Sequence, residues 1–249
     1  MDRKKILKNT NNINKCFKEL RNLYKTIPET KGCIDNLDIC KGWCCKFQSP
    51  SMLYIEFLHI WQSVLRDYEI EEIINLIELC IRTYVSNDIT KGCVLWDKET
   101  KLCKRHGDLR PFNCFIYGIT PDEEFNPRYE YLKEKYKDEI TAVIKPQCKL
   151  VSIVNGKKIT KQDTDGWWNK LVDIEKQLGI NKQDIHDGYD GTYRMFHDHL
   201  ILHICPDNVI ENLSRLRLSG ELEEKEEVIC TIINGLKNNS KTIIEKLKK

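Results

Sequence analysis

The stretch that decides the character of this chain reads Cys40-Lys41-Gly42-Trp43-Cys44-Cys45, and it stands near the start of a series of cysteines. The chain has 12 cysteines. Leaving aside the one in a predicted helix, the series over residues 33–148 is Cys33, Cys40, Cys44, Cys45, Cys93, Cys103, Cys114 and Cys148. Thiolates grouped in this way favour a metal centre, because soft sulfur ligands select zinc or an iron–sulfur cluster.

Disulfides are the alternative use of so many cysteines, but they are typical of short secreted proteins. This chain has 249 residues, and its first ten residues have no apolar core of a signal peptide. It also lacks an apolar run of about 18 residues, so we expect no membrane span. These features predict a cytoplasmic protein, in which clustered thiols stay reduced and serve metal binding or catalysis.

Charge is nearly balanced, with 40 Lys and Arg against 38 Asp and Glu. A domain that binds nucleic acid usually has a basic bias, so nucleic acid is an unlikely partner here. The sequence does not identify the protein or small molecule that the chain would bind instead.

Hydrophobic periodicity predicts mainly helix. The expected helices cover residues 4–26, 52–68, 69–84, 128–140, 162–178, 182–204, 206–218 and 221–247. Residues 30–48 lack periodicity and are predicted to be a ligand-bearing loop. Two hairpins are expected, one over 93–103 and one over 151–158 with Asn155-Gly156 at its turn. The predicted fold class is therefore mainly α, with a small β-hairpin element around a cysteine-ligated metal centre.

We predict two parts in the chain. Residues 1–150 would form a cysteine-cluster metal-binding domain with an N-terminal helix. Residues 151–249 would form a helical C-terminal region that packs on it.

A longer motif follows the Cys44-Cys45 pair. It consists of Cys93, then Cys103 after a short turn, and then Arg110-Pro111-Phe112-Asn113-Cys114. This order resembles the YkgJ-like cysteine-cluster family, a zinc- or iron-chelating domain, over roughly residues 33–150. The family's front block is usually Cys-x-x-Cys-x-x-Cys-Cys, whereas here six residues separate Cys33 from Cys40 and three separate Cys40 from Cys44.

The resemblance implies a metal site more directly than an activity. The same domain type occurs in the flagellin lysine-N-methylases, which implies an iron–sulfur cluster. An enzyme that methylates protein lysines with S-adenosylmethionine is therefore one alternative function. A zinc-stapled interaction module is another, and whether the chain is an enzyme stays open.

Zinc and an iron–sulfur cluster both fit the cysteines. Zinc would suit a closed tetrahedral site of four thiolates. A cluster benefits from apolar shielding, which Trp43, Phe47, Phe112 and Phe115 could supply. With the resemblance added, we expect an iron–sulfur cluster, with zinc as the alternative. All eight cysteines of the series are candidate ligands, in one centre or two.

Two further groups of residues have competing interpretations. Arg110 could offset the negative charge of a bound cofactor, or it could tie down loop carbonyls. His199 and His203 are four residues apart and would share one helix face, as metal-binding pairs do, although a polar helix face is the simpler interpretation. In the methylase alternative, the segment from His186 to His203 and Tyr189 or Tyr193 would lie near the reaction site.

The remaining cysteines have simpler interpretations. Cys16, Cys80 and Cys230 lie on apolar faces of predicted helices, where we expect small buried side chains. Cys205, just before Pro206, is ambiguous.

Overall fold

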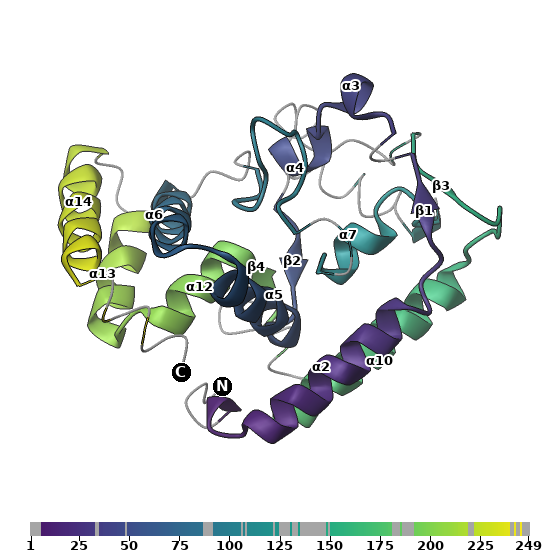
Figure 1. Ribbon diagram of the computed structural model, residues 1–249, viewed down its shortest axis with the longest axis horizontal. Helices are drawn as coiled ribbons and strands as arrows, with labels where there is room; N and C mark the ends of the chain where they lie inside the picture. The colour runs from purple at the N-terminus through teal and green to yellow at the C-terminus, as the bar shows by residue number, and fades with distance from the viewer. Residues whose placement is uncertain are drawn as a thin grey trace.

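The structure is a computed structural model. It describes residues 6–32, 35–47, 49–86, 92–105, 107, 109–121, 123–124, 130, 134, 148, 150–180, 185, 192–218, 222–239, 242 and 245. Over these residues the protein is mainly helical and has two small antiparallel sheets (Figure 1). The prediction of a mainly helical chain with a little β structure is confirmed.

The elements follow in chain order. They are α2 (Thr10–Tyr24), β1 (Thr30–Lys31), α3 (Leu37–Cys40), α4 (Trp43–Phe47), β2 (Ser51–Met52), α5 (Tyr54–Asp67), α6 (Ile70–Ser86), α7 (Phe112–Ile116), β3 (Ser152–Ile153), α10 (Lys161–Gln177), β4 (Arg194–Met195), α12 (Phe196–Ile204), α13 (Asp207–Leu218) and α14 (Leu222–Asn238).

Helices α2 and α10 lie side by side, although they are far apart in the sequence (Figure 1). The buried residues of α2 repeat every three or four positions and include Ile13, Phe17 and Leu20. Such spacing places them on one face, and this face packs against α10 and α5. A capping box of Thr160 and Asp163 satisfies backbone donors at the start of α10.

Helix α6 is the centre of the second group of helices. It contacts α12, α13 and α14, and α5 joins this group to the α2–α10 pair. Ion pairs hold the outer helices, with Arg82 on α6 at 2.8 Å from Glu226 on α14. One hydrophobic core cluster runs from Ile6 to Ile233 and so includes residues from both sides of position 150. The division of the chain at that position stays a prediction.

A buried carboxylate from α10 caps the N-terminus of α5. The Glu175 oxygens accept hydrogen bonds from the backbone N–H groups of Tyr54 and Ile55 at 3.0 and 2.8 Å. Free N–H groups at a helix start favour such an acceptor. Glu175 is fully buried, so this contact fixes α10 against α5 inside the core.

Two predicted elements differ from the structure. The Asn155-Gly156 turn forms, but Ser152–Ile153 pairs with Thr30–Lys31 of β1 instead of with residues after the turn, so the predicted hairpin over 151–158 is wrong. The helix predicted over 182–204 is not continuous, because Arg194–Met195 pairs with β2 just before α12 begins at Phe196, although Ile185 within that range is helical. Both differences come from long-range strand pairing, which local patterns do not contain.

The segment over residues 30–48 is also more regular than predicted. It contains β1 and the short helices α3 and α4. Lys41 and Gly42 have φ angles of 51° and 65°, and this left-handed backbone ends α3 and turns the chain into α4. The helix predicted over 128–140 lies almost wholly outside the described residues. Across the described helices, none combines the length and the apolar character needed to cross a membrane.

Candidate metal centre

The two cysteine-bearing loops meet through their backbones. Gly42 lies so close to the second loop that a Cβ atom on it would be 2.1 Å from the Lys101 oxygen. The Cys93 N–H donates to the Cys45 carbonyl oxygen at 2.8 Å. A Cβ atom on Gly92 would likewise be 2.1 Å from the Lys46 oxygen and 2.6 Å from the Cys45 oxygen. Close backbone approach of this kind requires glycine, and it brings segments 40–46 and 92–103 together.

The segment from Cys93 to Cys103 turns back on itself. Trp96 and Cys103 form an isolated antiparallel bridge, and the Asp97 N–H donates to the Leu102 oxygen at 2.8 Å. The Asp97 side chain accepts from the N–H groups of Glu99 and Thr100, which closes the turn. The predicted reversal is confirmed, but it is a single bridge rather than a pair of strands.

A third segment brings Cys114. Helix α7 begins at Phe112, whose backbone N–H donates to Oε1 of the buried Glu56 at 2.6 Å. Asn113 donates to the Ser51 carbonyl oxygen at 2.7 Å, which ties α7 to β2. These two bonds fix the short helix that carries Cys114. Sequence reasoning missed Glu56, since a lone glutamate on a predicted helix is usually exposed.

Six of the described cysteines interact electrostatically with one another: Cys80, whose pKa the neighbouring Cys93 helps to raise, and the five candidate ligands Cys44, Cys45, Cys93, Cys103 and Cys114. The Cys44 and Cys45 sulfurs are 3.9 Å apart. The hydrogen bond with Cys45 lowers the pKa of Cys44 to about 7, and the same contact together with burial raises the pKa of Cys45.

The other three candidate thiols are held in their neutral form. Burial and the neighbouring Cys103 raise the pKa of Cys93 to about 12. Burial is also the main cause that raises the pKa of Cys103, and it raises the pKa of Cys114 well above its ordinary value. Without a compensating cation, these sulfurs therefore remain protonated in the folded chain.

Arg110 lies beside this group of thiols. The pKa of Cys44 is lowered mainly by its hydrogen bond with Cys45, and the positive charge of Arg110 adds to this effect. The same charge also lowers the pKa values of Cys103 and Cys114, against the effect of burial. Its guanidinium is 4.7 Å from the centre of the Phe115 ring, and its Nε donates to the Gly107 oxygen at 3.4 Å. Arg110 thus binds a loop carbonyl and lies near the thiols, and its role toward a bound cofactor stays a prediction.

The remaining candidate ligands lie at the margin of this group. Cys40 ends α3, and the contact between Gly42 and Lys101 follows directly after it. Cys148 lies near the loop after α7, where a Cβ on Gly118 would be 3.4 Å from the Cys148 Cβ. Cys33 lies outside the described residues.

As positioned in the described part of the chain, no three His, Cys, Asp or Glu side chains are grouped to hold a metal ion. For all five candidate thiols to bind one metal centre, their side chains or the loops that carry them would have to move closer together.

One buried donor beside the thiols has no acceptor. Within the described residues, Nε1 of Trp96 is buried without a hydrogen-bond partner. This atom lies close to Gly42 and belongs to the residue that bridges to Cys103. A buried N–H group without a partner is costly, and cluster sulfides and thiolates accept such bonds. The donor set therefore fits a sulfur-rich centre, and sequence reasoning did not single out Trp96.

The aromatic shield predicted around the cysteines is seen in part. Phe112 is buried, and Phe115 packs with Tyr24 at 4.6 Å between ring centres. The side chains of Trp43 and Phe47 lie outside what the structure describes.

The histidines of α12 serve the core. His199 lies 3.0 Å from the Met52 carbonyl oxygen through Nε2, and Nδ1 of His203 is 3.0 Å from the Tyr54 hydroxyl. These contacts reach Met52 of β2 and Tyr54 of α5, and His199 is fully buried, so it does not lie on the polar helix face of the simpler interpretation. His186 and Tyr189 lie outside the described residues.

The other cysteines are divided. Cys16 and Cys80 are fully buried, as predicted, but Cys230 is exposed and bonds to Glu226 at 3.3 Å. The expectation of a buried Cys230 was wrong, because the side of α14 that carries it does not face α6. Cys205 is half-buried at the end of α12, and burial raises its pKa to about 11.

Comparison with known proteins adds no identification. The chain matches no protein-family model, no curated protein and no solved structure. The resemblance to the cysteine-cluster family stays a prediction.

Proposed function

We propose that this chain is a metal-binding protein of the cysteine-cluster type whose centre is an iron–sulfur cluster. Cys44, Cys45, Cys93, Cys103 and Cys114 are the principal ligands in this proposal. Cys33, Cys40 and Cys148 are further candidates. Such a cluster supplies one-electron redox chemistry, and it also holds together the loops that bind it.

The observation that supports the proposal is that three cysteine-bearing segments, far apart in the chain, lie next to one another. Backbone contacts join segment 40–46 to segment 92–103, and Glu56 fixes the start of the helix that carries Cys114. A hydrophobic core alone does not require five cysteines on three neighbouring segments. A bound cation would favour the thiolate form of each ligand over the neutral thiol that burial favours.

Two features favour a cluster over zinc. The five candidate thiols exceed the four that a closed zinc site takes. The Trp96 N–H group is a donor for sulfur acceptors, which tune the potential of a cluster. In this proposal Arg110 offsets part of the negative charge of the ligands, and Phe112 and Phe115 limit the access of water.

The test is anaerobic purification of the full chain, followed by measurement of iron, zinc and acid-labile sulfide per chain. We expect iron and sulfide in similar amounts, with visible absorption that bleaches on reduction. Stoichiometric zinc without sulfide would replace the cluster with the zinc alternative. A folded protein that takes up neither metal, even after reconstitution with iron and sulfide, would reject the proposal.

A further inference from the structure

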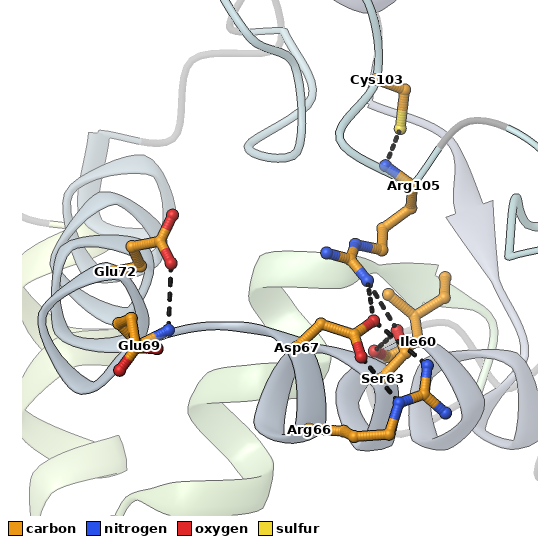
Figure 2. Close-up of polar contacts among 8 residues, drawn as sticks. All are labelled: Ile60, Ser63, Arg66, Asp67, Glu69, Glu72, Cys103 and Arg105. Carbon is orange, nitrogen blue, oxygen red and sulfur yellow. Dashed lines mark hydrogen bonds and ion pairs between the residues drawn. The ribbon is translucent and has the colours of Figure 1, made fainter.

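Cys103 has a hydrogen-bond donor of its own. The backbone N–H of Arg105 donates to the Cys103 sulfur over 3.3 Å (Figure 2). The side chain of Arg105 does not turn back to the thiols. Figure 2 shows it extending from the cysteine-bearing loop to the C-terminal part of α5.

Three residues of the α5 region hold the guanidinium of Arg105. Nη1 lies 2.9 Å from Oδ2 of Asp67 and donates to Oγ of Ser63 at 3.3 Å. Ser63 is the acceptor in this bond because its own hydroxyl donates to the Ile60 oxygen at 2.6 Å. The guanidinium also lies 4.6 Å from the centre of the Tyr68 ring.

This arrangement is a poor way to gain stability. Arg105 is only 7% exposed, so its charge has been removed from water. Its Nε is buried without a hydrogen-bond partner among the described residues, which is a further cost. Its partner Asp67 remains about a third exposed and also pairs with Arg66, so solvent and a second cation weaken the attraction. The anchored guanidinium needs another explanation.

We propose that Arg105 is a positioning residue for the metal centre, with Asp67 as its anchor. The anchored side chain holds the backbone N–H of Arg105 against the Cys103 sulfur. Cys103 would therefore bind the metal with this hydrogen bond already formed. An N–H group on a ligating sulfur withdraws electron density from it, which favours the reduced state of a cluster. The inference rests on the proposed metal centre and adds that α5 sets the electronic properties of one ligand.

The test uses two changes at the same anchor. Asp67→Asn weakens the hold on Arg105 and leaves every cysteine in place. Arg66→Ala is the matched control, because Arg66 also contacts Asp67, at 2.6 Å, but its side chain is 71% exposed. The double variant Asp67→Asn with Arg105→Lys tests whether Asp67 and Arg105 act on the centre through their mutual contact.

Metal content of the wild-type protein is measured first, since a chain without metal overturns the proposed function and this inference with it. For an iron–sulfur cluster, we then measure the midpoint potential and the rate of iron loss to a chelator. We expect Asp67→Asn to shift the potential to more negative values and to speed iron loss about 10-fold or more. Arg66→Ala should match the wild type, and the double variant should match Asp67→Asn.

If the wild-type centre is zinc, the energy of the thiolate-to-metal charge-transfer band of the cobalt-substituted protein takes the place of the potential. If the role of Arg105 is purely structural, the variants should change the stability of the protein but leave the midpoint potential or the band energy of the metal-loaded molecules unchanged. A metal-loaded Asp67→Asn variant with wild-type potential or band energy would overturn the inference while leaving the metal centre standing. An equal shift in Arg66→Ala would overturn it as well.

Discussion

Oε1 of Glu56, on α5, accepts the backbone N–H of Phe112, at the first residue of α7, over 2.6 Å. The same oxygen accepts the Tyr24 hydroxyl at 2.5 Å, and Oε2 accepts the Leu53 N–H at 2.8 Å. One buried carboxylate therefore joins α2, α5 and α7. Since Cys114 follows Phe112 by two residues, a core side chain determines where this candidate ligand lies.

Replacing that carboxylate should loosen the cysteine-bearing helix. In Glu56→Gln the amide NH₂ group cannot accept, so one or two of the three donors lose their partner. An unpaired buried donor costs about 1–3 kcal/mol, and we expect the free energy of unfolding to fall by that amount. Urea unfolding measures it, with Glu227→Gln on the exposed side of α14 as the control. Unchanged stability together with unchanged metal content would contradict the role given to Glu56.

Contact between the two cysteine-bearing loops can be tested at Gly42. It has a φ angle of 65°, and a Cβ atom there would lie 2.1 Å from the Lys101 oxygen and 2.7 Å from Trp96 Nε1. Gly156 has nearly the same φ angle, 62°, but open space around it. Gly156→Ala should cost only the left-handed strain, about 1–2 kcal/mol.

Gly42→Ala should cost about 1–3 kcal/mol more than that, because the added methyl group forces the loops apart. We also expect it to lower the metal bound per chain, which Gly156→Ala should leave at the wild-type level. Thermal unfolding and metal analysis of both variants provide the comparison. Equal losses in the two alanine variants would show that backbone strain, and not loop contact, is responsible.

Stability should depend on pH through Glu175. Burial raises its pKa from 4.5 to about 7 in the folded chain. The folded state therefore holds this proton more tightly than the unfolded state, and the stabilisation is fully present below pH 4.5 and lost as the pH rises to about 7.

The difference in unfolding free energy between the wild type and Glu175→Gln measures this group alone. Between pH 4.5 and 7 we expect the wild type to lose about 3 kcal/mol of stability relative to Glu175→Gln, because the pKa is shifted by roughly 2.5 units. Urea unfolding over this range measures it. A difference that stays flat, or changes in favour of the wild type, would refute the assignment.

The cysteines themselves provide the most direct prediction. Cys103→Ser and Cys114→Ser should each lower bound metal per chain by at least half, because hydroxyl groups are weak ligands for soft metals. Cys230→Ser is the matched control, since Cys230 is exposed on α14. Metal and sulfide analysis after anaerobic purification reads out all three. Loss of metal in Cys230→Ser would place the centre elsewhere in the chain.

Much of the helical fold follows from local sequence. The apolar stripes of α2 and α6 and the capping box at Thr160 are short-range patterns, and the helices form where these patterns predict them. The pairing of Ser152–Ile153 with Thr30–Lys31 could not be predicted in this way, because nothing near either segment specifies its partner. The exposed position of Cys230 was likewise decided by which face of α14 meets α6.

The candidate site divides along the same line. Sequence alone determined the chemistry of the donors, because the identity of a side chain decides that sulfur is offered. It left open which of the eight cysteines share a centre. Only the tertiary structure decided which thiols meet, through Gly42 against Lys101, Glu56 beneath Phe112 and Asp67 holding Arg105. These contacts join residues that are tens of positions apart, and such distances are closed by packing of the whole core rather than by local preference.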